Sequence, residues 1–191
     1  MEQKQSHPSR ADIDALAARL DRPIVLVGMM GVGKSSVGKR LSALLGFHFV
    51  DADDEIEESA QMTIPEIFDT YGEGYFRDGE RRVIARLIEE ARGKQVIATG
   101  GGAFCNEETR ALILDKAIAI WLDADIDTLV ERTSRKDNRP LLKQGNPREI
   151  LTRLRDERKG AYSQAPIHIL SGKGPHMETI DAIIERLGKW Q

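Results

Sequence analysis

The stretch "GMMGVGKSS", residues 28–36, places three glycines, one lysine and two serines directly after the apolar run "IVLV". Gly28, Gly33, Lys34 and Ser35 match the pattern G-x-x-x-x-G-K-S/T. The glycines allow successive backbone N–H groups to turn inward around a phosphate, and the following helix adds its positive end. The lysine would reach the β- and γ-phosphates, and the serine hydroxyl would ligate Mg²⁺. The pattern therefore predicts a cradle for a nucleoside triphosphate and leaves the phosphate acceptor open.

Six consecutive residues of this stretch are expected to contact the nucleotide. Lys34 is also a candidate catalytic residue, because its charge would stabilise the phosphoryl group during transfer. The alternative is a flexible turn, which the placement between a strand and a helix disfavours. The six residues are Gly31, Val32, Gly33, Lys34, Ser35 and Ser36.

The acidic stretch "DADD" follows the second predicted strand and narrows the choice of acceptor. Asp51 and Asp53 are two residues apart, so one carboxylate can support Mg²⁺ through water while the other faces a substrate hydroxyl. The alternative is a helix cap with acids placed at the positive end of the helix. That alternative accounts for Asp54 but not for all three carboxylates.

The stretch "YFRDGE" contains Arg77 just ahead of an acidic turn. An arginine fork recognises a carboxylate with two parallel hydrogen bonds. A lone arginine is more often solvated or ion-paired, so Arg77 is a candidate for a substrate carboxylate only together with other features.

The stretch "TGGGAF" places Gly100, Gly101 and Gly102 at the end of the third predicted strand. A tight turn needs only one or two glycines, so the alternative of a plain turn leaves one unexplained. Three glycines allow the backbone to approach a hydroxylated ligand closely.

Residues 134–147, "SRKDNRPLLKQGNP", form the one long polar and basic stretch. It contains Arg135, Lys136, Arg139 and Lys143. We expect either a lid that closes on phosphates or a charged surface loop.

The elements that must position these residues follow from the apolar pattern. Five apolar runs alternate with helical patterns, which predicts right-handed βαβ units and a parallel five-stranded sheet with helices on both faces. In such sheets ligands bind at the carboxyl ends of the strands, where the loops after Val27, Val50 and Thr99 all lie. The predicted strands are residues 24–27, 47–51, 95–99, 117–123 and 165–170.

Taken in order, these stretches resemble the shikimate kinase family. The resemblance spans about residues 22–189 and includes "GMMGVGKSSVGKRL", "DADDEIE", "FRDGE", "TGGGA", "NRPLL" and "ERKGAY". It implies a fold of the P-loop NTPase type, similar to nucleoside monophosphate kinases. It also implies ATP- and Mg²⁺-dependent transfer of the γ-phosphate to the 3-hydroxyl of shikimate, in aromatic amino acid biosynthesis.

The resemblance implies a role for each matching residue. Ser35 would ligate Mg²⁺, and Asp51 would support the metal through water. Asp53 would bind substrate hydroxyls and accept the proton, as a candidate catalytic residue. Arg77 and Arg158 would bind the substrate carboxylate, and Gly100, Gly101 and Gly102 would line the substrate pocket. Arg132 would lie near adenine. Arg139 would approach the phosphates from the lid, as a candidate catalytic residue.

One position departs from the family pattern. The family often has Arg-x-Pro-x-Tyr where this chain has Gly160 in place of the proline, in "RKGAY". Arg153, Arg155 and Lys159 therefore compete with Arg158 for the carboxylate.

The expected domain organisation is one kinase domain over residues 22–191, with its lid at about 134–147. Residues 1–21 are expected to form an amino-terminal extension, partly disordered or a short helix. Ser9 and Asp12 have the spacing of a capping box, and apolar residues from Ile13 to Leu20 follow helical periodicity.

Three separate helical stretches are expected between the second and third strands. An acidic helix starts at Asp54, Thr63 and Glu66 have the spacing of a second capping box, and apolar residues after Gly79 follow helical periodicity.

Composition limits the partners. The formal charge is −3, so no basic face points to nucleic acid. No apolar run approaches the roughly 20 residues that cross a bilayer, and the single cysteine excludes an internal disulfide. We expect a cytoplasmic monomer that binds ATP and shikimate, with neither nucleic acid nor membrane as a partner.

Two other functions stay open at this point. One is a kinase of another small hydroxy acid, such as gluconate. The other is a nucleotide-switch protein, although a guanine signature N/T-K-x-D is absent from "SRKDNR" and the Gly-Lys-Gly-Thr typical of nucleoside monophosphate kinases is replaced by Gly-Lys-Ser-Ser.

Overall fold

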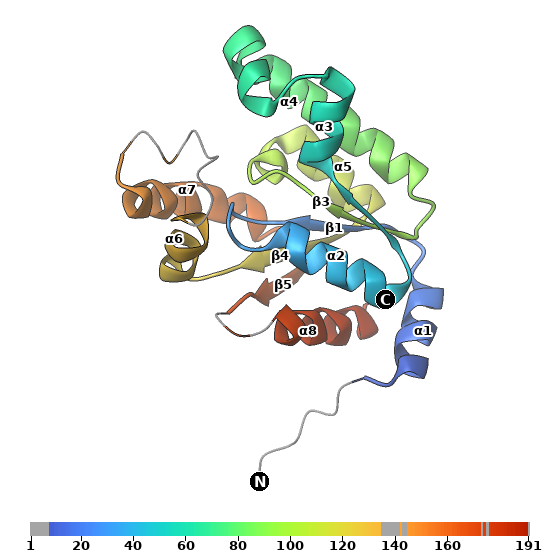
Figure 1. The fold of residues 1–191 in the computed structure, drawn as a ribbon. Coiled ribbons are helices and arrows are strands. Elements are labelled where there is room, and N and C mark those ends of the chain that lie inside the picture. The colour runs from blue at the N-terminus through green and yellow to red at the C-terminus, as the bar shows by residue number, and fades with distance from the viewer. Residues whose placement is uncertain (1–7, 135–141, 143–144, 173, 175, 191) are drawn as a thin grey trace.

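The computed structural model describes residues 8–134, 142, 145–172, 174 and 176–190. Strands and helices alternate along most of the chain (Figure 1). The strands are β1 (Ile24–Val27), β2 (His48–Asp51), β3 (Gln95–Ala98), β4 (Ile118–Asp123) and β5 (Ile167–Leu170). The helices are α1 (Arg10–Arg19), α2 (Lys34–Leu45), α3 (Ala52–Ala60), α4 (Ile64–Glu90), the 3₁₀ helix η1 (Ala103–Cys105), α5 (Glu107–Lys116), α6 (Ile126–Ser134), α7 (Pro147–Tyr162) and α8 (His176–Gly188).

The strands form one parallel sheet in the order β2-β3-β1-β4-β5. Val25 of the central strand pairs with Ile97 on one side and Ala119 on the other. Strands β1, β3 and β4 are buried along their whole length, as expected for strands covered on both faces. The predicted five-stranded parallel sheet is therefore confirmed.

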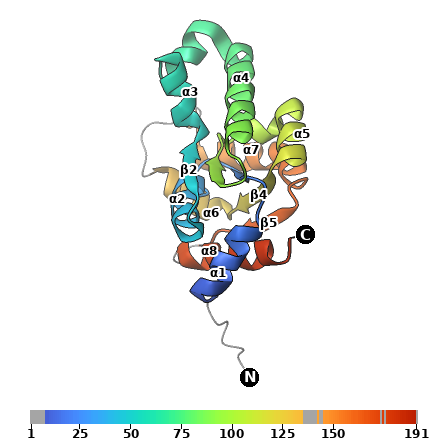
Figure 2. The same cartoon turned by 90° about the vertical axis from the view of Figure 1, so that its right-hand side faces the viewer.

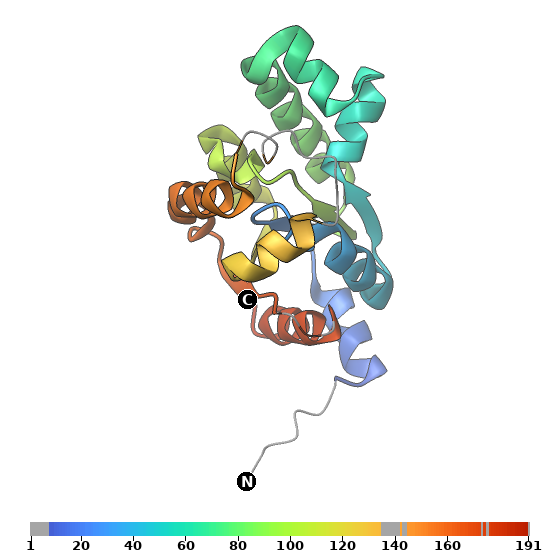
Figure 3. The same ribbon diagram turned by 60° about the vertical axis from the view of Figure 1, so that its left-hand side comes forward.

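Helices cover both faces of this sheet. Helix α2 packs against β1, β2 and β3, and α5 packs against β4 from the opposite face (Figure 2). Helices α6 and α7 pack against each other, and α7 also contacts η1 (Figure 3). Gly38 allows α2 to lie close to the sheet, because a Cβ there would be 2.5 Å from a ring carbon of Phe49.

Helices α3 and α4 form an arm that projects beyond the sheet (Figures 1 and 2). The arm has a small core of its own, around Ile56, Ile67 and Phe76. The predicted capping box of Thr63 and Glu66 starts α4, which kinks at Gly72, where φ is 80°. The sequence predicted separate helical stretches here, and the last two meet at the kink at Gly72.

The predicted short helix of the amino-terminal extension is present as α1. Ser9 and Asp12 form both hydrogen bonds of the capping box, and Leu16 is buried against α2 and α8. The Arg19 guanidinium donates hydrogen bonds to carbonyls at the end of α8, and the Lys94 ammonium donates one to the Ala17 carbonyl at 2.6 Å. The division of the chain at residue 22 stays a prediction, and residues 1–7 lie outside the described part. Among the helices described, none has the length and apolarity that would span a membrane.

The packing of α1 predicts that this helix stabilises the domain without serving the reaction. Leu16→Ala should lower the free energy of unfolding by about 2–4 kcal/mol, since it leaves a cavity in the core, and should leave kcat unchanged. Urea unfolding and a kinase assay at 25 °C measure both quantities. Asp14→Ala on the exposed face of the same helix is the matched control and should be nearly neutral. A loss of kcat in folded Leu16→Ala protein would contradict this role.

Candidate active site

The loop of residues 28–33, called the phosphate loop below, joins β1 to α2 at the carboxyl edge of the sheet. Gly28 has φ 136°, and a Cβ there would lie 2.2 Å from the Leu122 carbonyl oxygen of β4. Gly33, with φ 99°, is the residue before the first turn of α2. Both glycines are therefore required by the backbone path, and the free N–H groups of α2 begin at the loop.

Lys34 lies across the phosphate loop. Its ammonium donates hydrogen bonds to the carbonyls of Gly28 at 2.8 Å and Met29 at 3.0 Å. The residue is only 9 % exposed. The positive charge is thus held at the loop before any phosphate arrives.

The two residues predicted to support Mg²⁺ are in contact. The Ser35 hydroxyl donates to one Asp51 carboxylate oxygen at 2.6 Å, and the other oxygen accepts from the Asp53 N–H at 3.2 Å. Asp51 is therefore also the cap of α3, which begins two residues earlier than the Asp54 start expected from the sequence. Within the described residues no group of three His, Cys, Asp or Glu side chains could hold an ion. A serine with a carboxylate nevertheless fits Mg²⁺, which in such sites takes its remaining ligands from phosphates and water.

Two carboxylates meet at Gly100. A Cβ built on Gly100 would lie 2.8 Å from an Asp53 carboxylate oxygen and 2.9 Å from a Glu80 oxygen. Burial raises the pKa of Asp53 to about 6, the negative charges of Asp51 and Glu80 add to the shift, and the Lys34 charge opposes it. The site therefore contains a carboxyl group that titrates close to neutral pH.

Glu80 belongs to this site although the sequence did not predict it. It is 1 % exposed, burial raises its pKa, and Arg77 opposes that shift through an ion pair of 2.7 Å. Its second oxygen, Oε1, has no hydrogen-bond partner among the described residues. The available signal was the spacing in "FRDGE", since residues three apart on a helix are neighbours.

Two arginines lie at the other glycines of residues 100–102, called the glycine edge below. A Cβ built on Gly102 would be 2.5 Å from an Arg77 nitrogen, and Arg158 donates to the Gly101 carbonyl at 3.1 Å. A Cβ on Gly101 would lie 3.2 Å from the Met30 nitrogen. The glycine edge therefore touches the carboxylates, both arginines and the phosphate loop.

The structure also separates Arg158 from its competitors on α7. Arg155 pairs with Asp123 at 3.2 Å, and Arg153 pairs with a glutamate one turn further along the same helix. Lys159 is exposed. Among these basic residues, Arg158 is the one in contact with the glycine edge.

Arg132 connects the phosphate loop to the loop after β5. Its guanidinium donates to the Val32 carbonyl at 3.0 Å and to the Gly172 carbonyl at 2.7 Å. Its expected place near adenine stays a prediction. Arg139 and most of the predicted lid, residues 135–141 and 143–144, lie outside the described part of the chain.

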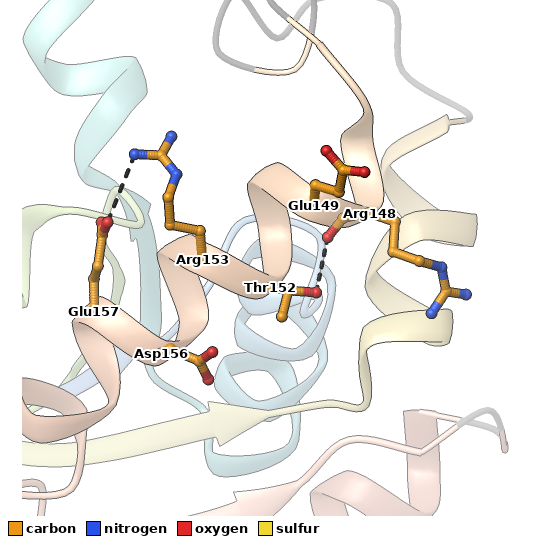
Figure 4. A pocket seen from close by; sticks show the side chains of 6 residues that line it. All are labelled: Arg148, Glu149, Thr152, Arg153, Asp156 and Glu157. Atoms are coloured by element: carbon orange, nitrogen blue, oxygen red, sulfur yellow. Dashed lines mark hydrogen bonds and ion pairs between the residues drawn. The ribbon is translucent and has the colours of Figure 1, made fainter.

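A hollow on the solvent face of α7 is separate from this site (Figure 4). The exposed side chains around it belong to one helix. Arg153 pairs with Glu157 at 3.6 Å, and Arg148 pairs with Asp127 of α6. Arg158 and Tyr162 lie on the inner face of the same helix. We assign the hollow no function. Its lining residues are Arg148, Glu149, Thr152, Arg153, Asp156 and Glu157.

Comparisons with known proteins identify the group to which this site belongs. A sequence model of the shikimate kinase family matches residues 30–188. The chain belongs to the shikimate kinase family. It is 61 % identical over 192 residues to a shikimate kinase of Novosphingobium aromaticivorans, with 100 % of both chains covered. It is 54 % identical over 174 residues to a shikimate kinase of Caulobacter vibrioides, covering 91 % of this chain and 86 % of that one.

A solved structure agrees with this assignment. The shikimate kinase of Acinetobacter baumannii in complex with shikimate has a TM-score of 0.83 to this chain at 35 % identity, covering 90 % of this chain and 96 % of the other. The P-loop NTPase-type fold is therefore confirmed. The protein transfers the γ-phosphate of ATP, used with Mg²⁺, to shikimate. Family membership also sets aside a gluconate kinase and a nucleotide-switch protein.

The raised pKa of Asp53 predicts that this residue destabilises the fold above pH 6. Because its pKa is raised from 3.8 to about 6, the stability that the neutral form contributes is present below pH 3.8 and lost as the pH rises through 6. Asp53→Asn is neutral throughout, so it should unfold with a free energy on the order of 2 kcal/mol higher than wild type at pH 8. The difference should shrink toward pH 4.

Chemical unfolding between pH 4 and pH 8 measures this difference. Glu58→Gln is the matched control, since Glu58 is exposed on the same helix. Equal stabilities of wild type and Asp53→Asn at every pH would show that burial does not perturb Asp53.

Proposed function

We propose that the reaction takes place at the carboxyl edge of the sheet, between ATP on the phosphate loop and shikimate on the glycine edge. The observation that carries this proposal is the contact of one short segment, Gly100–Gly102, with two carboxylates, two arginines and the phosphate loop. Charged groups of both signs are thus already directed at one place, as phosphoryl transfer between two bound molecules requires.

The nucleotide half consists of the phosphate loop and the first turn of α2. Backbone N–H groups of residues 31–36 bind the phosphates, and the Lys34 charge stabilises the transferring group. Ser35 and Asp51 would hold Mg²⁺, as their 2.6 Å contact supports. Bound there, Mg²⁺ would neutralise charge on the β- and γ-phosphate oxygens. Arg132 lies near the adenine.

The acceptor half consists of the arm and the glycine edge. Arg77 and Arg158 bind the shikimate carboxylate, and Glu80 positions Arg77 through their ion pair. Asp53 accepts hydrogen bonds from the substrate hydroxyls. With a pKa of about 6 it is mainly ionised at pH 7, so it can also take the proton of the attacking hydroxyl.

We propose that Arg139 supplies a further positive charge at the phosphates. From the lid at about 134–147 this residue approaches the phosphates and serves as a catalytic arginine, in the manner of an arginine finger. We further propose that the protein works as a monomer in the cytoplasm, without nucleic acid or membrane.

Replacing Arg77 by lysine tests the acceptor half. Arg77→Lys keeps the charge but loses the bidentate fork, so kcat/KM for shikimate should fall by roughly ten- to a hundredfold. The KM for ATP should change little because the phosphate loop is untouched. Coupled ADP-release kinetics with shikimate and its amide, shikimamide, give these values.

Wild type should prefer the acid over the amide by a similar factor, and Arg77→Ala should discriminate much less. Arg81→Lys, one turn further along α4 and paired at the surface, is the matched control. If wild type uses acid and amide equally well, no arginine recognises the carboxylate and the proposed acceptor half is wrong.

A further inference from the structure

The Gly101 carbonyl receives two hydrogen bonds from α7. Arg158 donates one at 3.1 Å, and the phenol of Tyr162 donates a second, short one. A carbonyl oxygen has two lone pairs, so both are used in the absence of substrate. Arg158 is also a proposed partner of the shikimate carboxylate, whose binding would draw the guanidinium away from the carbonyl.

Tyr162 is held rigidly where it makes this bond. It is the last residue of α7, it is 1 % exposed, and burial raises the pKa of its phenol, so the hydroxyl remains a donor at physiological pH. Its ring stacks on Trp121 with a centroid distance of 5.9 Å, and Trp121 stacks on His168 at 4.0 Å. The Met29 sulfur lies 4.0 Å from the hydroxyl. Packing therefore holds the Tyr162 ring, and the hydroxyl also lies beside Arg158 and Cys105.

We propose that Tyr162 is a positioning residue for shikimate binding, which keeps the Gly101 carbonyl hydrogen-bonded while Arg158 moves to the substrate carboxylate. The inference rests on the proposed role of Arg158. The Gly101 carbonyl is partly buried, and a carbonyl that is removed from water without any donor is costly. With Tyr162 present the carbonyl retains one donor when Arg158 leaves, and the glycine edge keeps its place beside the phosphate loop.

The hydrogen bond from the Tyr162 hydroxyl to the Gly101 carbonyl matters less in the protein without substrate. There Arg158 itself donates to Gly101, so loss of the phenol hydroxyl leaves the carbonyl with one donor. The cost of removing the hydroxyl appears only when shikimate draws Arg158 away. This separates a positioning role from a merely structural one, because a structural bond would matter equally in both states.

Tyr162→Phe tests this, since it keeps the stacked ring and removes only the hydroxyl. The dissociation constant for shikimate, measured by calorimetry, should rise about five- to thirtyfold, which is the lower part of the range for an unsatisfied buried carbonyl because the Gly101 carbonyl is partly buried. The kcat at saturating shikimate and the KM for ATP should stay near wild type, and the melting temperature of the free protein should change little. Tyr71→Phe, at an exposed tyrosine of the arm, is the control and should behave as wild type.

A double-mutant cycle separates this inference from the role of Arg158. Arg158→Gln alone should weaken shikimate binding, and adding Tyr162→Phe to it should weaken binding no further, since no guanidinium is left to be released. If Arg158→Gln does not affect binding, the proposed role of Arg158 fails, and the inference with it. If Arg158→Gln weakens binding but Tyr162→Phe alone does not, only the inference is overturned. It is likewise overturned if the two effects add fully, or if Tyr162→Phe lowers the melting temperature and kcat together.

Discussion

The absence of space for a Cβ atom along the glycine edge is the constraint on which the rest of the site depends. At Gly100 such an atom would meet two carboxylates, at Gly101 the phosphate loop and Arg158, and at Gly102 the guanidinium of Arg77. Because β3 pairs with β1, this edge lies directly beside the loop that follows β1. Because these three glycines have no side chains, groups from the arm, from α7 and from the phosphate loop can all come within reach of one substrate.

Gathering these charges destabilises the protein before it binds anything. Burial raises the pKa of both Asp53 and Glu80, and the ion pair with Arg77 offsets only part of that cost for Glu80. In exchange for this lower stability, the charges of the acceptor half are already oriented, so the side chains need little reorganisation during phosphoryl transfer. The bonds that Lys34 makes to loop carbonyls, and Arg158 to Gly101, hold the remaining charges in place until phosphate and carboxylate replace those partners.

Local patterns predicted most of the fold, because its signals are local. Continuous apolar runs marked the buried parallel strands, and both capping boxes formed as their spacing indicated. The site was harder, since burial of a charged residue is a tertiary outcome. No local pattern around Glu80 indicates that this residue of α4 is buried. The choice among the basic residues of α7 depended on which face of the helix meets η1. The cap of α3 at Asp51 was missed because that carboxylate serves Ser35 and the helix at once.

The measurement that tests this account most directly is the affinity of Gly100→Ala for its two substrates. Gly100 does not have a positive φ, so alanine fits its backbone conformation and the new Cβ acts mainly by pushing Asp53 and Glu80 from their positions. Calorimetry should show shikimate binding weakened by about ten- to a hundredfold, the range that overpacking a rigid site corresponds to. ATP should bind as before, and Gly74→Ala, in open space on the arm, should change neither affinity. If Gly100→Ala binds shikimate as wild type does, the glycine edge does not hold the site together.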